Sequence, residues 1–428
     1  MKLLHCPDLN SVKEIAQQLQ RPASDVSALR STVEPILADI KAHGDSALKR
    51  YTAQFDGITL ENLIFEIPTE IVLDASLKMA IDRAYRNIFE FHSAQVKQEP
   101  VVETMKGIVC YRKSVAIERV GLYIPGGTAP LFSTVLMLGI PARIAGCSEI
   151  VLCTPPNKEG KIHPAIQYAA QKCGIKKIVT LGGTQAIGAM AFGTESVTKV
   201  YKIFGPGNPY VTVAKQIIQT EGVAIDMPAG PSEVLIIADG TAYPAFVAAD
   251  LLAQAEHGVD SQVVLVCTNA QTVNAVFDAL KEQILVLPRA HIAAKALENS
   301  VTVIANDLNT AIAISNAYAP EHLIIQTNNA ANIAEKIINA GSVFIGHFSP
   351  ESVGDYASGT NHTLPTQGFA RAYSGVSVES FTKKITFQQL TEEGLKNIAH
   401  TVITMAEAES LYAHAEAVRK RFETGNRE

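Results

Sequence analysis

The sequence predicts an α/β protein with mostly parallel sheets, and three features of its 428 residues lead to this prediction. From residue 114 onward, apolar runs that suit strands alternate with amphipathic stretches that suit helices. A second series of the same kind begins at Glu233, and glycine-rich turns follow several of the apolar runs. Such alternation indicates βα units. The length favours two or three domains, although one large barrel would also fit.

The expected elements follow in order along the chain. Residues 11–91 have apolar positions at helical spacing and are expected to form a helical lead-in. The expected strands of the first series are residues 114–125, 148–156, 176–183 and 196–207, with helices at residues 163–175 and 208–222. The second series has strands at residues 233–239, 261–268 and 342–346, with helices at residues 243–258 and 330–341.

Two α/β halves suggest a cleft between them, because open parallel sheets bind ligands beyond the carboxyl ends of their strands. After about Phe369 the pattern weakens to short, Thr-rich pieces that suit strands. One long helix is expected from about Thr391 to Phe422. A helix at the end of a chain often packs on a neighbouring domain or subunit.

Composition excludes several classes of protein. A charged fraction of 18% is low, so much of the surface is expected to be buried, in part between subunits. The net charge of −6 argues against a nucleic-acid partner. We see no signal-peptide core and no apolar run long enough for a bilayer, so we expect no membrane partner and a cytoplasmic location. The six cysteines are scattered, which favours reduced thiols.

Three glycine-rich turns are candidates for a nucleotide site. Pro125, Gly126 and Gly127 join a strand to a helix, and Thr128, Ser133 and Thr134 offer hydroxyl groups nearby. Backbone amides at such a junction can bind a phosphate, although a tight βα turn explains the loop equally well. Residues 181–193 and 204–210 form two further turns, and none of the three is a GxGxxG fingerprint. All three are expected at the same end of consecutive βα units.

Several polar residues are candidates for a metal or substrate site. Gln254 and His257 lie three apart on an expected helix, hence on one face. Asp355 and His362 fall in a glycine-rich loop, and Glu409 and His414 fall on the terminal helix. Those last two are about 140° apart on a single helix, so they would not bind one atom side by side. Capping, turn formation and solvated helix faces are the alternative interpretations.

Glu321 and His322 follow Pro320 in a polar break between a helix and an apolar strand. A histidine suits a general base at neutral pH, and an adjacent glutamate can polarise a water. A hydrogen-bonded turn is the alternative. Ser232 lacks the GxSxG context of a nucleophile, so a hydrogen-bonding role is favoured. No HExxH motif of a zinc peptidase occurs.

Seven motifs in register resemble the histidinol dehydrogenase family, from about Val120 to the terminal helix. They are GLYIPGGTAPLFSTVLM, GPGN, DMPAGPSEVLIIAD, LLAQAEHGVDSQ, APEHL, GDYASGTNHTLPT and ESLYAH. The resemblance implies two incomplete Rossmann-like domains with small N-terminal helical and C-terminal segments. It also implies a zinc-dependent homodimer that oxidises L-histidinol through L-histidinaldehyde to L-histidine, the last step of histidine biosynthesis, with two NAD.

The family's functional residues match this sequence without a departure. The resemblance implies zinc ligands at Gln254, His257, Asp355 and His414, with His414 supplied by the partner subunit. Glu321 and His322 are the implied catalytic pair. Besides the zinc ligands and His322, the implied substrate contacts are Ser232, His362 and Glu409, and the implied NAD contacts are Tyr123, Gln185 and Asn208.

The resemblance also implies a division of the chain. Residues 1–22 would form the N-terminal segment, and residues 376–428 a C-terminal segment that reaches the partner subunit. Residues 23–122 and 233–375 would form the domain with the zinc and catalytic residues, and residues 123–232 the NAD side. A zinc hydrolase and a binding protein that senses metabolites of the pathway are the competing functions. The glycine-rich turns argue against the hydrolase, and the catalytic pair argues against the sensor.

Overall fold

The computed structural model describes residues 1–21, 26–126, 129–228 and 230–423. They divide into two compact units, of which the larger comprises residues 1–95 and 117–381. The smaller unit comprises residues 96–116 and those from 382 onward. Within the described ranges, no helix combines the length and apolar character that a bilayer span requires.

The first sheet of the larger unit, called the β5 sheet here, has the order β2-β7-β6-β5-β8-β9. The strands from β7 to β9 in this order are parallel, whereas the edge strand β2 pairs antiparallel with β7. The strands are β2 (Ile64–Glu66), β5 (Arg119–Tyr123), β6 (Glu149–Cys153), β7 (Lys177–Val179), β8 (Lys202–Phe204) and β9 (Ala224–Ile225).

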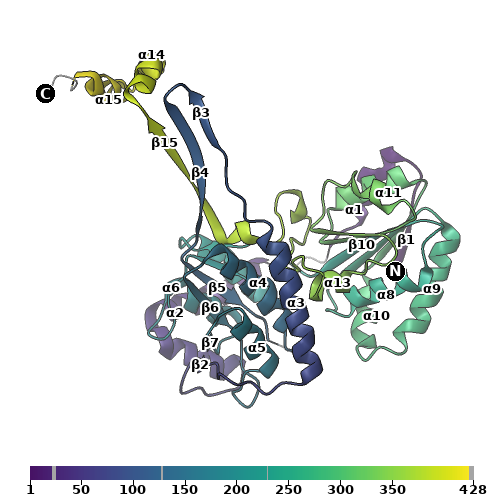
Figure 1. Cartoon of the computed structure of the whole chain (residues 1–428). Helices are drawn as coiled ribbons and strands as arrows, with labels where there is room; N and C mark the ends of the chain where they lie inside the picture. Colours follow the sequence, from purple (N-terminus) through teal and green to yellow (C-terminus); the bar gives the residue numbers. More distant parts are fainter. Residues whose placement is uncertain (22–25, 127–128, 229, 424–428) are drawn as a thin grey trace. The chain divides into compact units, whose positions relative to one another are not determined.

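Helices cover both faces of the β5 sheet (Figure 1). One face is covered by α2 (Val26–Phe55, broken at Gly44), α6 (Gly183–Phe192) and α7 (Pro209–Gln219). The other face is covered by α3 (Ala75–Ser93), α4 (Phe132–Ala145) and α5 (Pro164–Lys172). Two separate apolar clusters, one on each face, form the core of this half.

The second sheet, called the β10 sheet here, has the order β1-β12-β11-β10-β13-β14 and is parallel throughout. Every residue of β10 and β11 is buried, because helices cover both faces; this explains their continuous apolar sequences. The strands are β1 (Lys2–Cys6), β10 (Glu233–Ala238), β11 (Gln262–Cys267), β12 (Val301–Ala305), β13 (His322–Gln326) and β14 (Ser342–Ile345).

The helices of the β10 sheet again form two layers. One layer contains α1 (Val12–Gln18), preceded by a 3₁₀ turn (Leu9–Ser11), α11 (Leu308–Tyr318) and α12 (Ala330–Ala334). The other contains α8 (Pro244–Ala255), α9 (Ala270–Ile284) and α10 (Ala290–Glu298). A short helix, α13 (Glu351–Tyr356), packs against α8. Two 3₁₀ turns, Phe369–Arg371 and Val378–Phe381, end this unit.

The two sheets confirm the expected pair of incomplete Rossmann-like folds. Numbered within each half, the strands follow the order 3-2-1-4-5, and an N-terminal strand occupies the remaining edge. Sheet membership differs from the expected division of the chain, because residues 26–93 contribute α2, β2 and α3 to the β5 half. β1 and α1, in contrast, belong to the β10 half.

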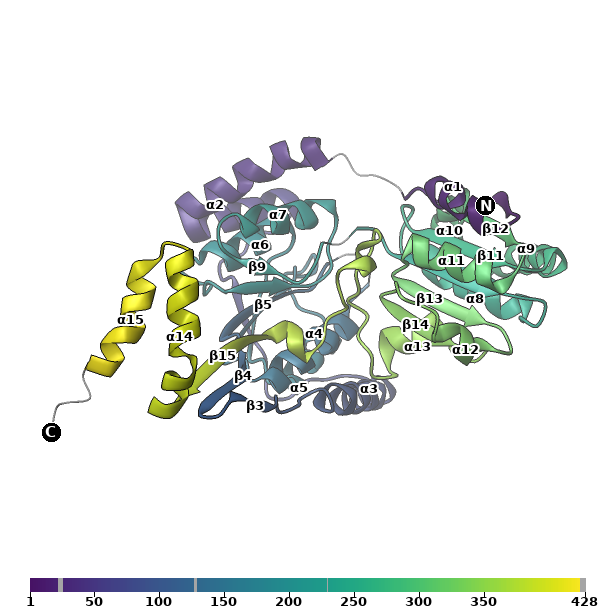
Figure 2. The same ribbon diagram turned by 90° about the horizontal axis from the view of Figure 1, so that it is seen from above.

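The smaller unit contains an antiparallel sheet of order β15-β4-β3 and two helices. Its elements are β3 (Val101–Met105), β4 (Ile108–Ala116), β15 (Thr382–Leu390), α14 (Glu392–Ala408) and α15 (Tyr412–Glu423). The helices lie side by side (Figure 2). The expected single terminal helix is therefore wrong, because the chain turns at residues 409–411, where Ser410 adopts a φ of 61°.

Other predicted elements agree with the structure in part. Residues 114–125 form two strands, the end of β4 and β5, where one strand was expected. The helix expected at residues 330–341 ends at Ala334. Residues 11–91 are mainly helical, as predicted, although β2 interrupts them. All six cysteines are free, which confirms the expectation of unpaired thiols.

Candidate active site

A cluster of polar side chains lies where the parallel strands of the β10 sheet begin, called its amino edge here. Glu233 is the first residue of β10 and His322 the first residue of β13. α8 connects the far end of β10 back to the start of β11, so His257, which follows α8, returns to this edge. α13 contributes Glu351 and Asp355.

His322 is at the centre of the cluster and is 3% exposed. Its Nδ1 atom lies 3.3 Å from the carbonyl oxygen of Glu233, 3.7 Å from Glu321 Oε2 and 3.8 Å from Glu351 Oε1. Its Nε2 atom lies 3.5 Å from Asp355 Oδ1. Nδ1 thus has three oxygen atoms within 3.8 Å, whereas Nε2 has no hydrogen-bond partner among the described residues and is available to a substrate proton.

The charges of the cluster shift its pKa values. Burial by itself would lower the pKa of His322, but the carboxylates of Glu351, Glu321 and Asp355 outweigh burial and raise it to about 10. Burial raises the pKa of Glu321 to about 7, and the charge of His322 opposes that rise. Burial raises the pKa of Glu351 as well. Three carboxyl groups around one imidazole are thus costly to ionise together in this buried region, and a bound cation would favour their charged forms.

Three residues of the cluster could hold such a cation. Ligand atoms of His257, Glu351 and Asp355 all lie within 4.8 Å of one another. Imidazole nitrogen and carboxylate oxygen are ligands that zinc accepts. Gln254, one helical turn before His257, is fully buried, and neither polar atom of its amide has a hydrogen-bond partner among the described residues. A buried amide without partners is costly unless a ligand satisfies it.

Glu351 is a member of the cluster that the motifs did not reveal. It is 2% exposed, and its Oε2 atom has no hydrogen-bond partner in the described part of the chain. Glu351 and Asp355 are four residues apart, so they lie on one face of α13. That spacing was the signal in the sequence, although a loop rather than a helix was expected there.

His362 adjoins the cluster through the backbone of Asp355. Its Nδ1 atom lies 2.9 Å from the Asp355 carbonyl oxygen, and its Nε2 atom lies 3.2 Å from the hydroxyl of Thr134. Burial lowers the pKa of His362, which favours a neutral ring. Ser232 is partly buried and immediately precedes Glu233, so it lies at the same edge of the sheet.

Glu409 and His414 lie in the smaller unit, and both side chains are exposed. Glu409 ends α14, and His414 lies in the first turn of α15. The angle expected for one continuous helix therefore does not apply to them. Their proposed roles at the metal and the substrate stay predictions.

A cavity of about 890 Å³ lies at the opposite, carboxyl edge of the β5 sheet. Tyr123, Gln185 and Asn208, the three expected NAD contacts, all line it. Tyr123 ends β5, and Gln185 and Asn208 follow β7 and β8, whose ends meet at this edge. Its volume is at the upper end of the range typical of small-molecule sites.

Glycines give the cavity its backbone surface. A Cβ atom on Gly126 would come within 2.2 Å of Pro155 Cγ, and one on Gly182 within 2.8 Å of Pro155 Cβ. These close approaches require glycine. The backbone N–H of Gly183 donates a 3.1 Å hydrogen bond to the hydroxyl of Tyr123. Gly127 and Thr128, named as candidates for phosphate binding, lie outside the described residues.

Asp56 is a cavity residue that the motifs did not reveal. It follows α2, far from the glycine-rich turns in the sequence, and accepts a 3.2 Å hydrogen bond from the Gln185 amide. Burial raises its pKa. Asn208 accepts a 3.0 Å bond from Val211 N and caps α7, so the polar wall of the cavity is fixed by helix ends.

Comparison with known proteins identifies the family of the chain. The family model of histidinol dehydrogenase matches residues 19–422. The chain is 56% identical to a histidinol dehydrogenase of Bacteroides thetaiotaomicron over 428 residues, which cover 99% of both chains. It is 53% identical to a relative of Arabidopsis thaliana described as chloroplastic, over 98% of this chain and 91% of that one.

A solved structure agrees with these sequence matches. The crystal structure of histidinol dehydrogenase from Elizabethkingia anophelis superimposes with a TM-score of 0.95 at 51% sequence identity. It covers all of this chain, and 99% of that chain is matched. Family model, sequence relatives and backbone thus agree over nearly the whole length, and the chain belongs to the histidinol dehydrogenase family of oxidoreductases.

Proposed function

We propose that the chain catalyses the zinc-dependent oxidation of L-histidinol to L-histidine through L-histidinaldehyde, with two NAD as electron acceptors. The observation that carries the proposal is the cluster at the amino edge of the β10 sheet. There, a candidate base, a candidate water-activating carboxyl group and candidate metal ligands lie within a few ångströms of one another.

Gln254, His257 and Asp355 are the proposed zinc ligands, together with His414 of the partner subunit. When bound, zinc would hold the imidazole and amine nitrogens of the substrate, and NAD would accept the hydride. Tyr123, Gln185 and Asn208 are the proposed NAD contacts. Ser232, His362 and Glu409 are the proposed further contacts to histidinol. The unpartnered amide of Gln254 and the lining of the 890 Å³ cavity support these assignments.

His322 would take the proton of the substrate hydroxyl in the first oxidation. The carboxylates around it favour a protonated ring, so this role requires a bound cation that offsets their charge and lowers the pKa of His322. The Glu233 carbonyl at Nδ1 and the Asp355 carboxylate near Nε2 would orient the ring. The aldehyde must then be hydrated, because a second hydride can leave only from a carbon that bears a hydroxyl group. Glu321, 3.7 Å from His322 Nδ1, would activate the water, and His322 would assist again. The burial of both side chains limits the access of bulk water to a reactive aldehyde.

An absorbance assay tests this function directly. Purified protein with L-histidinol, NAD and Zn²⁺ should form NADH, and two NADH should appear for each histidinol consumed. A chelator should abolish the reaction, and added Zn²⁺ should restore it. A zinc hydrolase or a metabolite sensor would form no NADH under the same conditions.

Substitution of the catalytic pair separates the two oxidations. Glu321→Gln should slow oxidation of supplied histidinaldehyde far more than that of histidinol, because only the aldehyde needs an activated water. His322→Asn should slow both, by about 10²- to 10⁴-fold, the usual effect of removing a positioned base. Stopped-flow measurement of each step provides the comparison. Equal losses in both steps for Glu321→Gln would contradict the assigned roles.

A mixing experiment tests the proposed homodimer with a shared site. His414→Asn and His322→Asn subunits should each be inactive but should complement each other, because a mixed dimer has one intact site. With random exchange, about a quarter of the wild-type activity should return. Absence of recovery after demonstrated subunit exchange would show that each site is built from one chain.

A further inference from the structure

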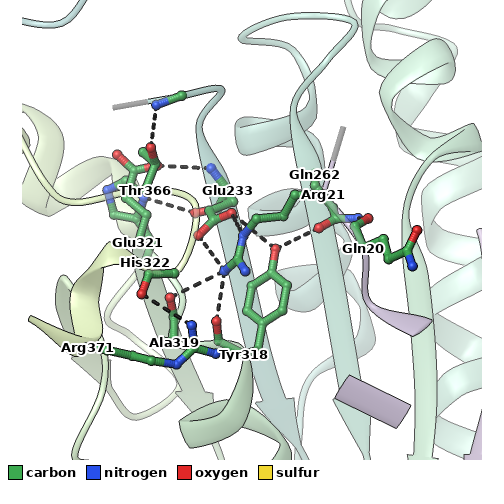
Figure 3. A network of polar contacts seen from close by, with 12 residues as sticks. Gln20, Arg21, Glu233, Gln262, Tyr318, Ala319, Glu321, His322, Thr366 and Arg371 are labelled. Atoms are coloured by element: carbon green, nitrogen blue, oxygen red, sulfur yellow. Dashed lines mark hydrogen bonds and ion pairs between the residues drawn. The ribbon is translucent and has the colours of Figure 1, made fainter. Parts of the chain in front are cut away.

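The N-terminal segment places an arginine between the start of β10 and the turn that leads into the proposed catalytic pair (Figure 3). Arg21 forms a bidentate ion pair with Glu233, through Nε to Oε2 and through Nη2 to Oε1 at 2.8 Å. The same Nη2 donates to the carbonyl oxygens of Tyr318, at 2.9 Å, and Ala319, at 3.3 Å. The guanidinium also stacks 3.8 Å above the centre of the Tyr318 ring.

Through Glu233, Arg21 restrains the backbone that contacts Glu321 and His322. The N–H of Glu233 donates a 2.9 Å hydrogen bond to Glu321 Oε2. Its carbonyl oxygen lies 3.3 Å from His322 Nδ1. Glu233 thus contacts both members of the pair through its backbone, while its side chain is bound to Arg21. Tyr318 adds to this restraint, since its hydroxyl lies 3.3 Å from the Glu233 carboxylate and 2.8 Å from Gln262 Oε1.

Arg21 also binds the turn at Tyr318 and Ala319, which precedes the catalytic pair. Ala319 ends α11 with a φ of 56°, a left-handed conformation that is unfavourable for alanine. It stands two residues before Glu321, so a change in this turn would move both catalytic side chains. The bonds of Arg21 to the carbonyls of Tyr318 and Ala319 stabilise the turn.

The contacts of Arg21 depend on the chemistry of its guanidinium group. Its planar guanidinium can bind a carboxylate with two donors, stack on an aromatic ring and still reach backbone carbonyls, which the single ammonium group of lysine cannot do. The ion pair of Arg21 and Glu233 is nearly inaccessible to solvent, with side chains 13% and 1% exposed. A buried ion pair is weak evidence for stability, since apolar residues can often replace it. Stability alone therefore does not explain why Arg21 joins Glu233 to the Tyr318–Ala319 turn.

We propose that Arg21 is a positioning residue for the Glu321–His322 pair, acting through the Glu233 backbone and the Tyr318–Ala319 turn. The inference rests on the proposed function. It assigns the N-terminal segment a role in turnover in addition to packing on the β10 sheet.

Three variants test the role. In Arg21→Lys and Arg21→Met, kcat should fall by up to about 100-fold, the loss that a displacement of about 1 Å can cause. KM for histidinol and NAD, and the zinc content, should stay within about twofold of wild type. In the double variant Arg21→Met/Glu233→Gln, the unpaired buried charge is removed, so the melting temperature should recover. Its kcat should stay low, because the link between the two segments is still missing.

Arg371→Met is the matched control. Arg371 donates to the carbonyl oxygen of Ala317, near the same helix end, but among the described residues its hydrogen bonds do not include Glu233. Its kcat should stay within twofold of wild type. The proposal is overturned if kcat in Arg21→Met equals that of wild type, if kcat recovers with stability in the double variant, or if Arg371→Met matches Arg21→Met. A wild-type chain that forms no NADH would instead refute the proposed function.

Discussion

The β5 and β10 sheets have the same strand order, yet they carry their candidate sites at opposite edges. The large cavity of the β5 sheet lies at the carboxyl edge, where ligands of open parallel sheets usually bind. The polar cluster of the β10 sheet lies at the amino edge, at the starts of β10 and β13. The expectation of carboxyl-end binding fits the cavity of the β5 sheet, whereas the candidate site of the β10 sheet lies at the other edge. Strand order alone does not decide which edge becomes a site.

Local residues explain the difference. At the carboxyl edge of the β10 sheet, Asn269 accepts a bond from Thr272 N, and Asp307 accepts one from Thr310 N. Both side chains cap helices there, as Asn208 does beside the cavity, so capping alone does not exclude a ligand. At the carboxyl edge of the β5 sheet, Gly126 and Gly182 present backbone without side chains. The β5 edge thus differs in the glycines that leave space beside its helix caps.

The largest effect is expected from the buried ion pair of the β5 sheet. Asp226 binds Lys215 and accepts 2.8 Å bonds from Gly205 N and Met227 N, so the pair fixes the turn before Asn208. A Cβ atom on Gly205 would come within 2.1 Å of the Tyr123 carbonyl oxygen, so this turn cannot shift freely. Lys215→Met leaves an unpaired buried carboxylate and should lower the free energy of unfolding by about 3–5 kcal/mol.

Ligand binding shows whether this loss is confined to one sheet. KM for NAD should rise in Lys215→Met, whereas zinc affinity should equal that of wild type. Urea unfolding and isothermal titration with Zn²⁺ measure the two quantities. An equal loss of zinc affinity would show that the two sites are not separate, and the comparison between the sheets would fail.

An intermediate effect is expected at the amino edge of the β10 sheet. Gln254→Leu removes a buried amide that has no hydrogen-bond partner in the described chain. The free energy of unfolding of the metal-free protein should therefore rise by about 1–3 kcal/mol. Zinc affinity should fall by at least about 10- to 100-fold, the effect already known for residues outside the ligand shell. Calorimetry with and without Zn²⁺ measures both changes.

Gln326 provides the matched control for Gln254. It is also buried, but its Nε2 donates a 2.8 Å bond to Asp250 Oδ2. Gln326→Leu should therefore destabilise the protein and leave zinc affinity unchanged. If Gln254→Leu behaves in the same way, Gln254 is not a metal ligand.

The smallest effect is expected from the thiols. Cys153 ends β6 beside the cavity of the β5 sheet, and burial raises the pKa of its thiol, which disfavours a reactive thiolate. Cys153→Ala should leave kcat unchanged, with a stability loss of about 1 kcal/mol. Replacement of all six cysteines should also preserve turnover. Loss of activity in a folded Cys→Ala variant would implicate a thiol in the chemistry.

The site residues differ in how far the sequence could predict them. Glu321, His322 and the Gln254–His257 pair stand in long motifs, and the structure brings His322 and His257 to one edge. Arg21, Asp56 and Glu351 carry no such motif. Each reaches its site from a distant segment, through contacts that depend on how helices pack rather than on local spacing. The break between α14 and α15 was missed because Ser410 gives no glycine or proline signal.

The sequence by itself determined the alternation of strands and helices, the two-half α/β fold and the family, because periodicity and long motifs are local properties of the chain. The tertiary structure decided which edge of each sheet holds polar side chains and which carboxyl groups surround His322. It also decided that an arginine from the N-terminal segment binds Glu233. These features join residues far apart in sequence, so they depend on packing, burial and the low dielectric around paired charges, which no local pattern encodes.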